Sequence, residues 1–322
     1  MLASNWPLVP IAVFYLLCAI VGIIGNSVMI VVFLKESRLK LPVNYLITLN
    51  CLADLFHVSG HFVFNYQLFT ETTSSQAACF FLSVPAVFGY FISGPLLLAI
   101  GIDRLVACQL PVTYRSILLS YRNLYLSAQL LFPFAFTTFF FVHGSQLIDY
   151  DTKIVCMIPL AMPHPAFTYY SYASNIINIA IVFVYMTTYF VLGGYKGRDA
   201  CRMRNVFKSI AVTVLVVLVG YVTVAIGNTV AFGIIEHRKT SEIVSIHAGI
   251  GVNVSCSINV FVFYAINSEY RTAIRHLLDI EMGKTSDSTK VRVSESTTNK
   301  GKIIVVAPAG TVNPFQSRTY LR

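Results

Sequence analysis

Two adjacent charged residues, Asp103 and Arg104, end a long apolar stretch that begins near Cys79. The 25 residues from Cys79 to Arg104 would extend roughly 37 Å as an α-helix, which is about one membrane with its interfaces. We therefore expect the cysteine at one face of a bilayer and the Asp-Arg pair at the other. A structural ion pair at such an interface would add little stability by itself.

A second apolar stretch contains Asp54, the only carboxylate expected deep in lipid. An ionisable residue inside a span is costly and is usually functional. Two interpretations stay open. Asp54 is either protonated or hydrogen-bonded by Asn26, or it forms an oxygen-rich Na⁺ pocket with three further residues. These are Ser93, Ser255 and Asn259.

Two histidines follow Asp54 on roughly the same helical face, His57 at i+3 and His61 at i+7. Such spacing is compatible with metal binding or a proton relay. Because no second cluster of His or Cys supplies further ligands, the pattern favours packing or lining of a pocket over a metal site.

The composition indicates which elements hold these residues. The chain has 322 residues, of which 56% are hydrophobic and 11% charged, and its mean hydropathy is +0.70. Soluble domains carry about 25% charged residues, so we expect an all-α integral membrane protein whose backbone is satisfied within helices. Seven stretches are long enough to span, at 10–34, 43–66, 79–103, 122–143, 166–193, 207–234 and 243–265.

The basic residues predict the orientation of this seven-helix domain, residues 10–267. With residues 1–9 outside, 20 of the 23 Lys and Arg residues face the cytoplasm, as the positive-inside rule requires. The net charge of +9 is thereby explained without nucleic acid. The basic loops would face anionic membrane lipids or an acidic cytosolic partner.

The carboxyl-terminal part divides into two segments. Residues 268–282 predict a short amphipathic eighth helix on the inner leaflet, because Ala273, Ile274, Leu277 and Leu278 have helical spacing. Residues 283–322 predict a disordered cytoplasmic tail. Eight Ser or Thr residues lie between Thr285 and Thr298, and their phosphorylation could recruit an arrestin; a merely solvated tail is the alternative.

Several short motifs occur in a fixed order across these spans, and together they resemble a rhodopsin-like G-protein-coupled receptor over about residues 10–280. Within that group the chain most resembles the nematode serpentine chemoreceptors of class Srsx. The motifs are Gly25-Asn26, Leu52-Ala-Asp54, Cys79, Asp103-Arg104-Leu105 with Pro111 and Tyr114, Cys156, Asn259, and Asn267-Ser-Glu-Tyr-Arg271.

The resemblance implies roles for some of these residues. Cys79 and Cys156 would form a disulfide, with two free thiols as the alternative. Arg104 would pair with Asp103 at rest, near Tyr114, and turn toward a heterotrimeric G protein when active. Many relatives also restrain this arginine with an acid at the base of the sixth span, which here offers Asn205, Phe207 and Lys208. We therefore expect appreciable signalling without ligand.

The chain also departs from the family's usual pattern. Its only tryptophan is Trp6, and neither the fifth nor the sixth span has an internal proline. The usual Asn-Pro-x-x-Tyr of the seventh span reads Asn259-Val-Phe-Val-Phe263. Because proline loosens a helix by removing a backbone hydrogen bond, the usual hinge geometry is in doubt. Gly220 and Gly227 could supply flexibility instead.

By the same resemblance, a ligand pocket would lie between the outer halves of spans three, five, six and seven. Ala86 replaces the acid of amine receptors, and Asn253 replaces the retinal-linking lysine of opsins. Biogenic amines and retinal are therefore disfavoured. The other candidate lining residues suit a small, weakly polar ligand, although each could instead pack between helices. They are Tyr90, Phe91, Tyr169, Tyr172, Asn175, Asn228 and His247.

The leading hypothesis is a chemosensory G-protein-coupled receptor in the plasma membrane, with a sensory cilium implied by the family. A neuropeptide receptor is the nearest alternative. A transporter or channel is more remote, since inverted repeats and several intramembrane charges are not evident. We expect no enzymatic activity, because Gly101-Ile-Asp103 lacks the first glycine of an intramembrane aspartyl protease motif. No cofactor is expected beyond the candidate Na⁺.

Overall fold

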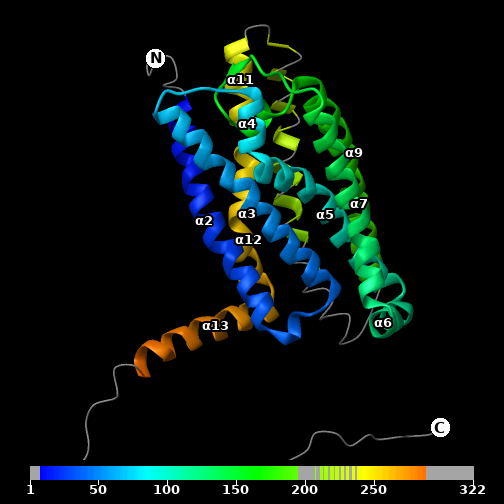
Figure 1. Cartoon of the computed structure of the whole chain (residues 1–322). Helices are drawn as coiled ribbons and strands as arrows, with labels where there is room; N and C mark the ends of the chain where they lie inside the picture. Colours follow the sequence, from blue (N-terminus) through cyan, green and yellow to red (C-terminus); the bar gives the residue numbers. More distant parts are fainter. Residues whose placement is uncertain are drawn as a thin grey trace, which may run out of the picture. The chain divides into compact units, whose positions relative to one another are not determined.

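The computed structural model describes residues 8–194 and 238–287, together with separate positions between 207 and 235. Six apolar segments in this part of the chain are long enough to cross a membrane (Figure 1). They are α2 (Val9–Lys35), α3 (Pro42–Phe69), α5 (Val84–Gln109), α7 (Arg122–Ser145), α9 (His164–Gly194), and Ile243–Ile266, which joins the end of α11 (Arg238–Ala248) to α12 (Ile250–Ile266). A shorter apolar helical stretch, Val214–Val224, lies within the expected sixth span.

The shorter elements connect these helices. They are η2 (Ser37–Leu39), β1 (Ser74–Ser75), α4 (Gln76–Leu82), α6 (Pro111–Ser120), β2 (Lys153–Ile154), α8 (Ile158–Ala161) and α13 (Ser268–Asp287). Strands β1 and β2 pair antiparallel, with Ser74 opposite Ile154. Figure 1 shows α4 and α11 at one end of the bundle and α6 at the other.

The outward faces of the long helices are as apolar as their packed faces. On α2, for example, Leu17, Ile24 and Leu34 are exposed by 57%, 62% and 66% of their surface. Such rows of large aliphatic side chains are unfavourable in water but match hydrocarbon chains. The protein is accordingly a multi-pass membrane protein.

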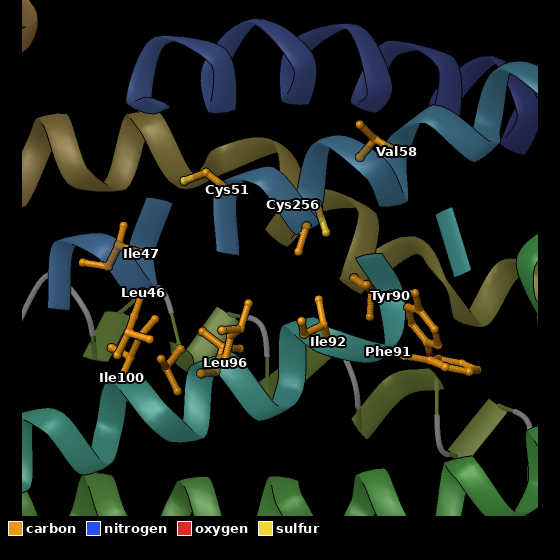
Figure 2. Close-up of a cluster of buried hydrophobic side chains, with 14 of the residues drawn as sticks. Leu46, Ile47, Cys51, Val58, Tyr90, Phe91, Ile92, Leu96, Ile100 and Cys256 are labelled. Atoms are coloured by element: carbon orange, nitrogen blue, oxygen red, sulfur yellow. The ribbon is translucent and has the colours of Figure 1, made fainter. Parts of the chain in front are cut away.

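Helices α3 and α5 form the centre of the bundle. Helix α3 packs against α2 and α5, α5 packs also against α7 and α9, and α12 packs against α2 and α3. Figure 2 shows the apolar cluster between them, with Leu46 and Ile47 of α3 near Leu96 and Ile100 of α5. The buried polar residues of these helices therefore lie among apolar side chains.

The expected third span is divided near its outer end. Helix α4 ends at Leu82, and the N–H of the following residue, Ser83, donates to the carbonyl of Cys79 at 2.9 Å. Helix α5 then begins with Pro85 in its first turn, a position where the missing proline N–H costs nothing. The single helix expected from Cys79 onward is thus two helices.

Gly220 and Gly227, which could supply flexibility, lie at close helix contacts. A Cβ at Gly220 would lie 2.7 Å from the backbone of Gly251, and a Cβ at Gly227 would lie 2.2 Å from the Ala248 Cβ. In membrane bundles small residues allow helix backbones to approach each other. We therefore assign these glycines to packing.

Helix α13 begins where the Asn267 side chain accepts hydrogen bonds from the N–H groups of Glu269 and Tyr270, at 3.0 and 3.3 Å. This is the usual satisfaction of a helix amino terminus. Ala273 and Ile274 are buried, whereas Leu278 is exposed. The helix runs to Asp287, five residues beyond the expected end, and the remainder of the expected tail lies outside the described residues.

Candidate functional site

The charged pair at the inner end of α5 forms a compact cluster with one residue of α6. Arg104 Nε donates to Asp103 Oδ2 at 2.9 Å, and its Nη2 also bonds the same oxygen. The Tyr114 hydroxyl accepts from Arg104 Nη2 at 3.2 Å and donates to Asp103 Oδ1 at 3.1 Å. The Asp103 side chain is fully buried, and that of Arg104 is 13% exposed. The guanidinium is therefore held inside the bundle by two partners.

The Tyr114 hydroxyl is protonated in this cluster. Burial is the main cause that raises its pKa above the ordinary value, and the Asp103 carboxylate raises it further. The hydroxyl can thus donate to Asp103 and accept from Arg104 at the same time.

A second tyrosine, Tyr185 of α9, lies near the same end of α5. A Cβ at Gly101 would be 2.7 Å from its ring. Its buried hydroxyl has no hydrogen-bond partner among the described residues. Sequence reasoning missed Tyr185, because an isolated tyrosine in an apolar helix carries no signal of its own.

The middle of the bundle holds a polar network around Asp54. Asp54 Oδ2 accepts from Asn259 Nδ2 at 2.7 Å and from Asn50 Nδ2 at 3.2 Å, and Oδ1 accepts from Ser93 Oγ at 3.3 Å. Asn259 also donates to Asn26 Oδ1 at 3.4 Å. Helices α2, α3, α5 and α12 all contribute to this network, so its geometry depends on their relative positions.

The structure places Ser255 differently from the expectation. Its hydroxyl donates to the carbonyl of Val252 at 2.7 Å and has no recorded bond to Asp54. The Sγ of the next residue, Cys256, lies 3.5 Å from His57 Nδ1.

Two oxygens of the network are suited to a further ligand. Asn50 Oδ1 and Asn259 Oδ1 are buried and have no partner among the described residues. Both residues line a cavity of about 20 Å³, which is large enough for one water or one small ion. The oxygen-only donor set fits a hard cation such as Na⁺.

The outer end carries a disulfide between Cys79 and Cys156, with Cα atoms 5.2 Å apart. The Cys156 N–H also donates to Gln67 Oε1 at 2.6 Å. This segment is thus tied to both α4 and α3. Met157 and Ile158, which follow it, line a cavity of about 50 Å³ whose other walls come from α2, α3, α5, the Val214–Val224 stretch, α11 and α12.

Comparison with known families supports one assignment. The family model described as serpentine type 7TM GPCR chemoreceptor Srsx matches residues 19–278, which is most of the chain. The chain belongs to the Srsx family of serpentine chemoreceptors. A comparison with curated proteins gives no match. The family is one of chemosensory, G-protein-coupled-type receptors, not of enzymes.

In this Srsx chain, the candidate ligand residues do not gather in one place. Tyr90 and Asn253 line the outer cavity. Phe91 is buried and stacks on Tyr170, with ring centroids 4.0 Å apart. Ala86 is buried next to the Gly60 position. Asn228 lies outside the described residues.

The remaining candidates lie away from the cavity walls. Tyr169 and Tyr172 are 59% and 66% exposed, on the surface where lipid would be. Asn175 is partly buried. His247 Nδ1 donates to the carbonyl of Ile243 at 2.8 Å. Instead, His57 and His61 line the outer cavity. For these two histidines the sequence favoured packing between helices or lining of a pocket.

Proposed function

We propose that this chain is a chemosensory receptor of the plasma membrane that activates a heterotrimeric G protein. Its amino terminus is outside, and it binds a small, weakly polar molecule in the outer half of the bundle. The observation that carries the proposal is the Asp103–Arg104–Tyr114 cluster at one end of α5. In this cluster the Arg104 guanidinium is buried and can be released. It lies at the end of α5 that the distribution of basic loops predicts to be cytoplasmic.

The physical basis is the cost of keeping Arg104 inside the bundle. A buried guanidinium is tolerated only while its partners satisfy it. A helix movement that separates Asp103 from Tyr114 would free Arg104 for carboxylate or carbonyl oxygens of a G protein. Ligand binding at the other end of α5 can favour such a movement only if the ligand binds more tightly to one of the two helix arrangements than to the other.

The Asp54 network is proposed as a Na⁺ site that stabilises the resting arrangement. Asp54 and Ser93 would hold the ion, assisted by the free oxygens of Asn50 and Asn259. An ion shared by α3, α5 and α12 would favour the arrangement in which these helices meet. On the inner surface, α13 would contact membrane lipids, and a phosphorylated tail would bind an arrestin.

The direct test is G-protein activation in cells, with surface expression verified, for the intact chain and Arg104→Ala. A panel of volatile, water-soluble and short-peptide cues serves as stimulus. We expect the response of the intact chain to fall by at least about tenfold in Arg104→Ala, because the fork of charge-assisted hydrogen bonds is lost.

The control is Lys153→Ala, which removes one exposed positive charge at the opposite end and should respond as the intact chain does. An equal response of Arg104→Ala and the intact chain would refute coupling through this arginine. A response to short peptides alone would favour a neuropeptide receptor. Cue-dependent solute or ion flux without nucleotide exchange would favour a transporter or channel.

A further inference from the structure

The outer cavity has a distinctive lining. Its walls are mostly apolar, and its side-chain polar groups belong to Tyr15, His57, His61, Tyr90, Ser245 and Asn253. No Asp, Glu, Lys or Arg is among its described lining residues. A ligand with a formal charge would lose its hydration there without gaining an opposite charge, which is strongly unfavourable.

Several of these polar groups already satisfy one another. The Tyr15 hydroxyl donates to the carbonyl of Ile246. The ring of His61 donates through Nε2 to Asn253 Oδ1, and Asn253 Nδ2 donates to the carbonyl of Gly249 at 2.9 Å. These bonds link α2 and α3 to α11 and α12 and build the cavity wall.

His57 is the exception. Its side chain is only 4% exposed, its Nδ1 lies 3.5 Å from Cys256 Sγ, and its Nε2 has no hydrogen-bond partner among the described residues. The ring is fixed edge-on against Tyr90, with centroids 5.3 Å apart. Polar side-chain atoms inside a protein nearly always have a hydrogen-bond partner, so an unpartnered ring nitrogen on a side chain that lines the cavity points to a ligand.

We propose that this cavity is the ligand site and that it takes a small neutral molecule with a hydroxyl or carbonyl oxygen, bonded to His57 Nε2. The proposal rests on the receptor function proposed above and moves the site away from α9, the fifth span, toward α2 and α3. The volume of about 50 Å³ restricts the ligand to a few non-hydrogen atoms.

A second cavity, of about 310 Å³, lies next to this one and shares Pro159 with it. Its lining is mostly apolar, with Gln76, Thr152, His164 and Ser241 as the polar residues.

The experiment measures binding without a G protein. The purified full-length receptor is placed in lipid nanodiscs, and its thermal unfolding midpoint is titrated with acetone, isopropanol, cyclopentanone and cyclopentanol. Cyclopentane, cyclopentylamine and cyclopentanecarboxylic acid are the matched apolar and charged probes. We expect at least one alcohol or ketone to raise the midpoint saturably, and the matched apolar and charged probes to have no such effect.

Two substitutions then distinguish the roles of the two ring nitrogens of His57. The amide of His57→Asn reaches about as far as Nδ1 and retains the contact with Cys256, whereas the amide of His57→Gln reaches about as far as Nε2. We expect His57→Asn to weaken the apparent Kd about tenfold, the value of one good hydrogen bond, and His57→Gln to retain most affinity. His143→Gln, on α7 beside Phe139, is the histidine control and should bind normally.

Three outcomes would each overturn the proposal. No alcohol or ketone stabilises the receptor, His57→Asn binds as tightly as the unaltered chain, or cyclopentane binds as strongly as the alcohols and ketones. G-protein activation is measured separately. Binding that depends on His57 without any activation would refute the proposed receptor function and keep the site. Activation of His57→Asn at an unchanged half-maximal ligand concentration would keep the function and refute the site.

Discussion

In the proposed mechanism, the hydroxyl of Tyr114 helps to hold the resting state. It bridges Arg104 and Asp103, which otherwise share only their mutual ion pair. The base of the expected sixth span has no acidic residue that could hold Arg104 in place of Tyr114. Asn205 and Lys208, which occur there, lie outside the described residues. The restraint on Arg104 therefore depends strongly on α6.

Tyr114→Phe should raise ligand-independent nucleotide exchange. Removing one hydrogen-bonded hydroxyl is worth about 0.5–1.5 kcal/mol, which corresponds to a two- to tenfold shift between resting and active populations. Basal exchange is measured at equal surface density. Tyr121→Phe, an exposed tyrosine at the end of the same loop helix, is the control. Unchanged basal exchange in Tyr114→Phe would show that the hydroxyl is not a restraint.

At the scale of elements, α3 and α5 make a close backbone contact in the bundle core. A Cβ at Gly89 would lie 2.3 Å from the carbonyl oxygen of Ala53 and 2.8 Å from the backbone nitrogen of His57. Both neighbours are backbone atoms and cannot rotate away. Only glycine therefore permits α5 to approach α3 so closely, and this approach sets the positions of both Asp54 and His57.

Gly89→Ala should separate the two helices and lower the unfolding free energy by about 1–3 kcal/mol, as other overpacked interiors do. The thermal midpoint of the purified receptor is the measurement. Gly94→Ala on the same helix is a matched control, because the nearest atom to its Cβ would be 4.0 Å away. There alanine should be neutral or stabilising, by up to about 1 kcal/mol. Equal midpoints for the two variants would contradict the close contact.

At the scale of the whole molecule, the outer end is held by bonds between distant parts of the chain. The disulfide joins residues 77 positions apart, and the pairing of β1 with β2 joins the same two regions. The segment that follows Cys156 lines the cavity. Fixing this segment therefore shapes the proposed ligand site as well as stabilising the fold.

Replacing both cysteines with serine should lower the thermal midpoint, with a loss of about 2–5 kcal/mol in unfolding free energy. Loss of the covalent link should also weaken the saturable stabilisation by alcohols or ketones, because Met157 and Ile158 would be less restrained. A reducing agent should lower the midpoint of the unaltered receptor toward that of the double variant. It should leave the double variant itself unaffected. A midpoint insensitive to both changes would contradict this role.

Much of the architecture could be predicted from the sequence, because hydropathy along the chain is enough to locate membrane helices. The ends of α2, α3, α7 and α9 lie within a few residues of the predicted spans. The Asp103–Arg104–Tyr114 cluster was also predictable, because two members are adjacent and the third follows one loop later. Cys79 and Cys156 were expected to pair from the resemblance, and the structure contains that disulfide.

Tertiary structure alone decided which polar side chains meet inside the bundle. Successive residues on a helix differ by about 100° in direction, and helices that are apolar on every side give no signal of their rotation. Thus Ser255 was expected at Asp54, but its hydroxyl donates to the carbonyl of Val252 within its own helix. Likewise Tyr172 was expected in a pocket but is on the outer surface, while His57 lines the cavity. Helix rotation is set by close packing, such as that at Gly89, and the physical information for it lies in contacts between spans.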